Sequence, residues 1–472
     1  MEKLKPNAGQ DIEDSLPSRS HAVGGGGALQ RLRGVFSQSA SAISDQGFFA
    51  LGNFAVSTIL ARQMSKTAFG QFSAAFAAFI LLSTIYCAFV VDPMLVYGVS
   101  KAHDRQRSYV RGVVSLHWRI ALLLSISLLG VGLIRWQTGA GAGSMVAYVG
   151  WAIAAPAVLR LWLARRTTYL VAKPQYAALA GGAYLVLIVV LLFAFRSLLA
   201  TDVIAACLII AISSVSIGLL LDRSVRLKDA VPDSIASIKV AGEHWTFGRW
   251  ASVAGILGLL PDYVYFFVLS PEKCGEYRAL LNVVIPLTQV YNALGVLMMS
   301  YFARHRHRTD FTRIVLRIAA AYAGTAIVLA ALAVTFGGRL FDHLYAGKYD
   351  LRFSLLLPLG IVSVLFALKT VSDAVLRSLE NVTVMAGIAV VGATAALACG
   401  VPLALRFGIM GAVYGNLLVY CIATTAMAAV WLQRYRTTRM RQRSTEVRAG
   451  MGSYSELAVA ETQLESFTET PW

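Results

Sequence analysis

The sequence predicts an all-α membrane protein with about twelve transmembrane helices, arranged in two six-helix lobes. Of its 472 residues, 57% are hydrophobic and 14% are charged, whereas a soluble chain is roughly 25% charged. The charges lie in short segments between apolar runs that match or exceed the length of about 20 residues needed to cross a bilayer. Because backbone polar groups in lipid must be paired within the segment, runs of this length form helices. They are too long for barrel strands of about ten residues.

Twelve apolar runs are candidate spans. The weakest boundary is Phe195-Arg196-Ser197, between the fifth and sixth runs, and loss of that break would leave eleven spans. The predicted spans are 45–63, 68–92, 112–134, 144–164, 176–195, 199–221, 245–269, 277–302, 313–336, 353–376, 382–405 and 409–432.

The distribution of Lys and Arg predicts the orientation of the spans. If the N-terminus is cytoplasmic, the cytoplasmic segments hold a roughly threefold excess of basic residues over the opposite side. Both termini are therefore predicted to be cytoplasmic. The expected organisation is a disordered tail (1–40), a first lobe (41–221), an inter-lobe linker (222–244), a second lobe (245–433) and a C-terminal tail (434–472).

The charge and the motifs exclude several classes of function. The net charge of +17 lies mainly beside the predicted spans, where anionic headgroups attract it, so we expect no nucleic-acid partner. The basic run Arg304–Arg308 is interpreted as a topology anchor. Five scattered cysteines indicate no disulfide or metal cluster. We expect no metal, cofactor or enzymatic activity, because no phosphate-cradling loop or catalytic constellation is evident.

An internal repeat supports the division into two lobes. The turn after the first span reads Ser65-Lys66-Thr67-Ala68-Phe69-Gly70-Gln71-Phe72. The turn after the seventh reads Ser270-Pro271-Glu272-Lys273-Cys274-Gly275-Glu276-Tyr277. Ser, Gly, Gln/Glu and an aromatic residue recur in register. Six spans per half is an even number, so both halves start on the same side, as in some transporters.

Ionisable residues inside the predicted spans are the candidate functional residues, because charges in lipid are costly. The basic candidates for binding an anionic substrate are Arg119, Arg249, Arg278 and Lys369. The acidic candidates for a coupling ion are Asp262, Asp92 and Asp373. Pro93 and Pro261 lie beside two of these acids and are expected to break the helix and free carbonyl groups.

Each candidate also has a structural interpretation. For Arg278, as for Arg160, we favour extension of the side chain to the membrane surface. Lys369, Asp373 and Arg377 are spaced by four residues and share one helix face, where they could simply neutralise one another.

Several segments resemble a known family. The N-terminal part of the resemblance is carried by Asp45-Gln46-Gly47-Phe48, Gly52-Asn53-Phe54, Leu60-Ala61-Arg62, Phe69-Gly70-Gln71-Phe72 and Asp92-Pro93-Met94-Leu95-Val96. The C-terminal part is carried by Asp262-Tyr263, Cys274-Gly275-Glu276-Tyr277-Arg278 and Phe407-Gly408-Ile409-Met410-Gly411-Ala412. These segments resemble the polysaccharide-type flippases (Wzx-like O-antigen or exopolysaccharide translocases) of the multidrug/oligosaccharidyl-lipid/polysaccharide exporter superfamily.

The resemblance implies two six-helix lobes and a cleft for a polyprenyl-pyrophosphate-linked oligosaccharide, flipped outward across the bacterial inner membrane by alternating access. It also implies proton or sodium coupling and association with polysaccharide polymerase or export machinery. Three alternatives stay open: a cation-coupled multidrug exporter of the same superfamily, a membrane-embedded glycan polymerase or ligase, and a structural partner of an assembly complex. A polymerase or ligase needs a catalytic loop outside the membrane, and the longest such loop, about 337–352, is short.

Overall fold

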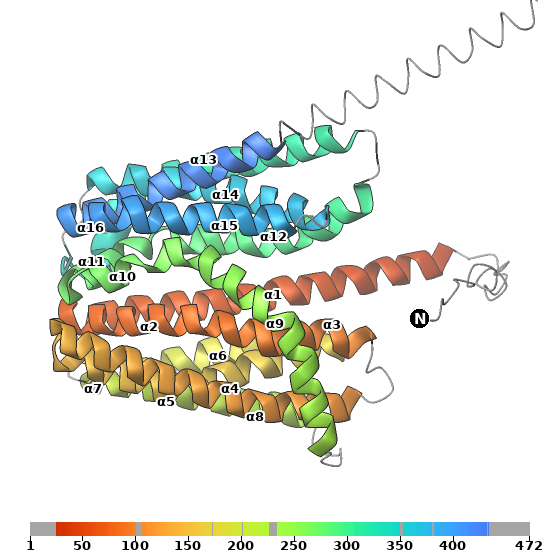
Figure 1. Ribbon diagram of the computed structural model, residues 1–472, viewed down its shortest axis with the longest axis horizontal. Helices are drawn as coiled ribbons and strands as arrows, with labels where there is room; N and C mark the ends of the chain where they lie inside the picture. The colour runs from red at the N-terminus through yellow and green to blue at the C-terminus, as the bar shows by residue number, and fades with distance from the viewer. Residues whose placement is uncertain are drawn as a thin grey trace, which may run out of the picture.

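The computed structural model describes residues 25–100, 106–171, 173–200, 202–225, 234–306, 308, 310–349, 353–379, 382–431 and 433. Within these ranges the chain forms helices and turns and no strand. The helices run side by side in two lobes, one above the other in Figure 1. This confirms the predicted all-α membrane fold.

The N lobe contains the first six passes, in which α5 packs on α4 and α8, and α1 packs on α6. Its elements are α1 (Gly25–Gln63), α2 (Lys66–Tyr86), η1 (Cys87–Val91), α3 (Asp92–Ser100), α4 (Gln106–Arg135), η3 (Trp136–Ala140), α5 (Ala142–Leu170), α6 (Pro174–Ala194), α7 (Arg196–Leu199) and α8 (Val203–Val225).

The C lobe contains the other six passes, in which α14 packs on α12, α13 and α15. Its elements are α9 (Ser234–Tyr263), α10 (Tyr265–Val268), α11 (Pro271–Leu281), α12 (Ile285–His305), α13 (Phe311–Tyr345), η5 (Phe353–Leu355), α14 (Leu356–Ser378), α15 (Val382–Ala395), η6 (Ala396–Gly400), α16 (Val401–Phe407) and a last helix, Ile409–Trp431.

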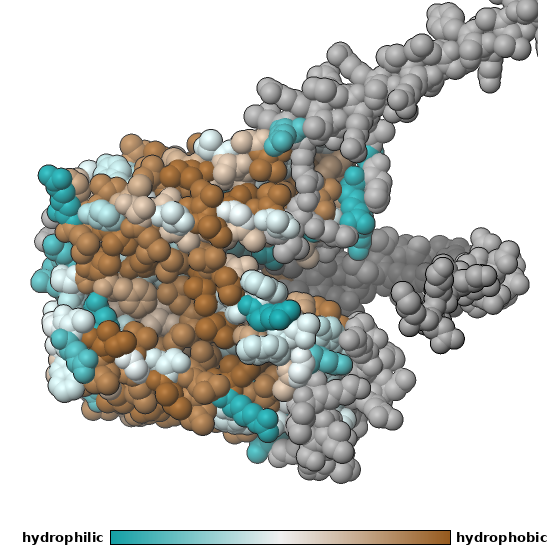
Figure 2. All heavy atoms as spheres, viewed as in Figure 1, coloured by the Kyte–Doolittle hydropathy of each residue, from teal (hydrophilic) through white to brown (hydrophobic). Residues whose placement is uncertain are grey.

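Nine helical segments of the described residues are long and apolar enough to cross a membrane. The remaining three passes, α1, α9–α10 and α11–α12, are less apolar, and each carries a charged residue inside its predicted span or at its edge: Asp45, Asp262 and Arg278. Figure 2 shows an apolar surface between two more polar margins, as a bilayer requires. The fifth and sixth spans are separate helices, α6 and α8, because the chain turns through the short helix α7.

Two predicted boundaries are corrected. Helix α1 begins at Gly25, so residues 25–40 of the predicted disordered tail are helical. Residues 28–40 are rich in Ala, Leu, Gln and Arg, which favour helix. The predicted linker 222–244 is also largely helical, because α8 runs to Val225 and α9 begins at Ser234. The rest of the first tail, residues 226–233 and the tail 434–472 lie outside the described residues.

Proline deforms the membrane helices without ending them. The π-helical turns η1 and η6 each end two residues before a proline, Pro93 and Pro402. A proline ring clashes with the carbonyl four residues earlier, and a wider turn at that point relieves the clash. The predicted break beside Asp92 is therefore a π-helical turn, and α9 passes through Pro261 and ends at Tyr263.

Apart from α9, which packs on both lobes, the lobes meet at one end of the bundle. We call it the hairpin end because α1 turns into α2, and α10 into α11, there (left in Figure 1). Helix α2 of the N lobe crosses α11 of the C lobe at this end. A Cβ added to Gly70 would overlap the Pro271 carbonyl oxygen, and one added to Gly275 would overlap that of Lys66. The two helices therefore touch backbone to backbone, and we call this crossing the seam.

Polar contacts between the lobes reinforce the seam. Lys66 Nζ lies 3.1 Å from Glu276 Oε1. Lys348, after α13, donates to the carbonyl oxygens of Ala61 and Met64 at the end of α1. These carbonyls have no partner within the helix, so a lysine that caps them stabilises the end of α1 while it joins the two lobes.

Helix α9 bridges the lobes over its length. It packs on α2, η1 and α4 of the N lobe and on α15 of the C lobe. Buried His244 lies 2.7 Å from the Phe89 carbonyl oxygen and 2.8 Å from the Tyr109 hydroxyl, while Trp245 stacks on Phe89. Because a carbonyl only accepts, His244 Nδ1 carries a proton and donates to Phe89.

Candidate functional site

The described residues form a pocket inside the N lobe, starting one turn from the seam. Helices α1, α2, α5, α6 and α8 supply most of its lining, and α11 of the C lobe supplies one residue. The lining residues are Phe49, Asn53, Val56, Ser57, Phe72, Ser73, Phe76, Phe79, Ile80, Trp151, Val158, Trp162, Tyr184, Ile210 and Arg278.

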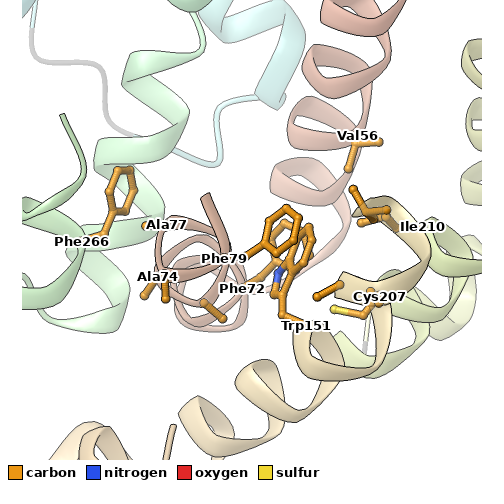
Figure 3. Close-up of a cluster of buried hydrophobic side chains, with 14 of the residues drawn as sticks. Val56, Phe72, Ala74, Ala77, Phe79, Trp151, Cys207, Ile210 and Phe266 are labelled. Carbon is orange, nitrogen blue, oxygen red and sulfur yellow. The ribbon is translucent and has the colours of Figure 1, made fainter. Parts of the chain in front are cut away.

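Aromatic rings dominate the pocket. Phe79 stacks on Trp151 with ring centroids 4.8 Å apart, and Phe72 lies 5.4 Å from the same indole. Figure 3 shows these three side chains gathered between α2 and α5, with Val56 and Ile210 nearby. The sequence favours this arrangement because Phe72, Phe76 and Phe79 recur at helical spacing and therefore share one face of α2.

Arg278 is the one charged residue among the lining residues. Its guanidinium lies over the ring of Phe76, 5.1 Å from the centroid, and its Nε donates to Ser57 Oγ at 3.3 Å. The side chain therefore does not extend to a membrane surface. Arg160, for which the same extension was favoured, pairs with Asp222 of α8 inside the N lobe.

Two of the lining side chains carry unpaired hydrogen-bond donors. The indole Nε1 atoms of Trp151 and Trp162 are buried and have no partner within the described residues. An indole nitrogen and a guanidinium can only donate. With no carboxylate in its described lining, the pocket suits a ligand rich in oxygen acceptors and in negative charge, and disfavours an organic cation.

The other predicted basic residues lie away from the pocket. Arg119 is exposed on the face of α4 that also carries Leu122, Leu123 and Ile126. Arg249 is exposed on α9, with its guanidinium 6.0 Å from the ring centroid of Trp250.

Lys369 belongs to a charged cluster within the C lobe. Its Nζ lies 2.7 Å from Asp373 Oδ2, one turn along α14. Nearby, the Tyr420 hydroxyl of the last helix donates to Asp262 Oδ1 of α9 at 3.0 Å, and Lys369 acts electrostatically on Asp262. The structure thus joins two predicted coupling-ion residues and one predicted substrate residue into a single cluster with one more negative than positive charge.

Asp92 stands apart from that cluster. It is exposed at the start of α3, and the cations that act on it are Arg166 of the N lobe and Arg377 of the C lobe. Asp92 therefore faces both lobes, towards the end opposite the seam.

Solved transporter structures match the chain, whereas no protein family model and no curated protein does. An inward closed conformation of the lipid II flippase MurJ matches with a TM-score of 0.64 and 13% identity, over 84% of this chain and 86% of that one. An inward-facing multidrug resistance MATE family transporter of the MOP superfamily matches with a TM-score of 0.65 and 14% identity, over 86% and 99%. The chain has the fold of these MOP-superfamily transporters.

A third neighbour is a MOP superfamily transporter from Pyrococcus furiosus, with a TM-score of 0.56 and 14% identity over 84% of this chain and 95% of that one. It is described as having a binding pocket of reverse polarity that suggests a different function.

One charged pair inside this MOP fold was missed by the sequence reasoning. Asp45, 1% exposed, accepts hydrogen bonds from Arg165 at 2.9 and 2.7 Å and from the Tyr169 hydroxyl at 2.8 Å. The Arg165 guanidinium also lies 3.9 Å from the ring centroid of Phe49, a pocket residue. Both charges lie outside or at the edge of the predicted spans, so they do not stand out as charges within an apolar run.

Proposed function

We propose that this protein is a transporter that flips a lipid-linked, polyprenyl-pyrophosphate oligosaccharide across the bacterial inner membrane, for export of an exopolysaccharide or O-antigen. The observation that carries the proposal is the polarity of the N-lobe pocket. Its only charge is Arg278, its unpaired buried polar groups include two indole donors, and its described lining has no carboxylate.

The chemistry of such a substrate fits these residues. A pyrophosphate presents oxygen acceptors, and an arginine guanidinium binds phosphate oxygens with two parallel hydrogen bonds. Sugar hydroxyl oxygens accept hydrogen bonds from indole donors, and the aromatic rings offer the largely apolar lining typical of ligand sites. The polyprenyl tail can stay in the lipid while the head group crosses.

In this proposal the substrate is closer in kind to that of the lipid II flippase than to those of the multidrug transporters among the fold neighbours. An exporter of organic cations needs acidic groups where its substrate binds, because a cation buried without a counter-charge is costly. The acids Asp262 and Asp373 instead lie in the C lobe, each with a hydrogen-bond donor, Tyr420 or Lys369.

In the proposed orientation, which the excess of basic residues predicts, the hairpin end lies outside the cytoplasm and both termini lie inside. With the lobes joined at the hairpin end, this arrangement corresponds to an inward-facing state. In the proposed cycle the head group enters the N-lobe pocket from the cytoplasm, the seam opens, and the opposite ends of the lobes close. Asp92 and Arg377, one from each lobe, are then candidates to pair.

The C-lobe cluster is the proposed coupling site. Asp262 is the leading candidate to take up a proton or a sodium ion, with Asp373 and Asp92 behind it. One added positive charge would neutralise the cluster of Asp262, Asp373 and Lys369, which lowers the cost of moving it within the membrane. Polysaccharide polymerase or export machinery is the proposed partner, by resemblance alone.

Reconstituted vesicles test the proposal. Vesicles containing the full chain should flip a fluorescent polyprenyl-pyrophosphate disaccharide faster than protein-free vesicles, and Arg278→Gln should abolish the difference at equal protein content. Export of organic cations without flipping of the glycolipid would favour the multidrug alternative. Glycan polymerisation or transfer by the purified chain would favour the enzyme alternative.

A further inference from the structure

A chain of directed hydrogen bonds runs from the pocket into the C lobe. Arg278 Nε donates to Ser57 Oγ at 3.3 Å, and Ser57 donates to Asn282 Oδ1 at 3.0 Å. Asn282 Nδ2 donates to the Tyr345 hydroxyl at 3.0 Å, and Tyr345 donates to the Ala279 carbonyl oxygen at 3.3 Å. Ser57, Asn282 and Tyr345 are all buried.

Only one arrangement of protons allows all four of these hydrogen bonds to form. Arg278 can only donate, so Ser57 must accept from it and send its own proton to Asn282. A flipped Asn282 amide would leave the Ser57 proton without an acceptor and would turn the Tyr345 proton away from Ala279. Because each buried polar group is satisfied in one orientation only, the chain fixes the position of the Arg278 guanidinium.

This series of hydrogen bonds also crosses from one lobe to the other. Ser57 belongs to α1 of the N lobe. In the C lobe, Arg278 belongs to α11, Asn282 directly follows α11, and Tyr345 belongs to α13. Arg278 lies three residues after Gly275 of the seam on the same helix. Separation of the lobes at the hairpin end would therefore break both hydrogen bonds of Ser57 and withdraw Arg278 from the ring of Phe76.

We infer that Ser57, Asn282 and Tyr345 are positioning residues that hold Arg278 in the N-lobe pocket only while the seam is closed. The inference rests on the proposed function, in which Arg278 binds the anionic head group. The pocket then binds an anion tightly in the closed-seam state and weakly in the open-seam state, because its only cation leaves with the C lobe. A ligand shifts a conformational equilibrium towards the state that binds it more tightly, so a bound anion favours the closed seam, and opening of the seam favours its release.

Equilibrium binding of radiolabelled farnesyl pyrophosphate to the full chain in lipid nanodiscs tests the inference. Ser57→Ala is expected to weaken binding by about tenfold, because the hydrogen bond that it removes involves a charged group. Ser57→Thr keeps the hydroxyl and should restore binding. The matched control is Ser125→Ala, which removes a hydroxyl that joins α4 to α5 outside the pocket and should bind as the unaltered chain does.

A double-mutant cycle separates positioning from a general structural role. If Ser57 acts through Arg278, adding Ser57→Ala to Arg278→Gln should cause no further loss of binding. Additive losses would overturn the inference. Tyr345→Phe, which removes only one hydroxyl, should weaken binding in the same direction and also be silent in the Arg278→Gln background; unchanged binding in Tyr345→Phe itself would remove Tyr345 from the chain.

A locked seam tests the dependence on state. Cysteines at Lys66 and Glu276, joined by a short bifunctional reagent in a chain whose native cysteines are replaced, should keep full affinity for the probe. Loss of binding on cross-linking would contradict the inference. Failure of the unaltered chain to bind the probe would instead count against the proposed function, so the two failures are distinguishable.

Discussion

Gly70 and Gly275 occupy equivalent positions in the two halves of the chain, and each lies against the backbone of the other's helix. The oxygen that a Cβ on Gly70 would meet belongs to Pro271, and the oxygen that a Cβ on Gly275 would meet belongs to Lys66. Pro271 and Lys66 are themselves equivalent, each four residues before its glycine. The repeat that the sequence indicates is therefore a two-fold contact in space, formed by the repeated segments themselves.

Alanine at either glycine should open the seam. The obstructing atoms are backbone atoms that cannot move aside, so we expect Gly70→Ala or Gly275→Ala to cost about 1–3 kcal/mol in the closed-seam state. The yield of the cross-link between cysteines at Lys66 and Glu276 should fall in both variants. Gly47→Ala on α1 meets no atom within 4 Å and should leave the yield unchanged; an equal fall there would refute the role of the seam.

Substitutions of the three arginines predicted to bind substrate should differ in their effect on substrate binding. Arg278→Gln should reduce binding of a polyprenyl pyrophosphate by at least about tenfold, because it removes the only cation of the pocket. Arg119→Gln and Arg249→Gln should bind as the unaltered chain does, since both side chains are exposed and neither lines the pocket. A large loss in Arg119→Gln with Arg278→Gln intact would move the site out of the N lobe.

Asp262 and Tyr420 should affect coupling rather than binding. We expect Asp262→Asn to abolish the stimulation of transport by an imposed proton or sodium gradient, and Tyr420→Phe to weaken it. Binding of the probe to the N-lobe pocket should persist in both variants. Asp342→Asn, at an exposed acid on α13, serves as the control; gradient-driven transport that survives in Asp262→Asn would exclude Asp262 from coupling.

The pair of Asp45 and Arg165 should be required for stability. Loss of one partner leaves a buried charge uncompensated, which typically costs about 3–5 kcal/mol, so Asp45→Asn should lower the Tm of the purified protein. The exposed pair of Arg308 and Asp310 provides the comparison, and Arg308→Ala should leave the Tm unchanged. A Tm for Asp45→Asn equal to that of the unaltered chain would show that this pair is dispensable.

The sequence by itself determined the membrane fold and its two-part plan. Hydrophobic runs long enough to cross lipid must be helices, and the repeated turns mark the same place in each half. Both properties are local, so they can be read without knowing which helices are neighbours. The breaks near Pro93 and Pro261 were only partly predictable, because a helix in lipid keeps its hydrogen bonds by widening a turn where it can.

Only the tertiary structure decided which of the intramembrane charges share a site. Arg119 and Arg278 look alike in sequence, since each is an arginine in or beside an apolar run. Packing places Arg278 across the lobe boundary on Phe76 and Ser57, and it leaves Arg119 on an exposed apolar face. The physical reason is that the rotation of each helix about its axis is set by all the helices that pack on it. The sequence indicates the repeat at the seam, but only the structure shows that Arg278, one turn after Gly275, enters the pocket of the other lobe.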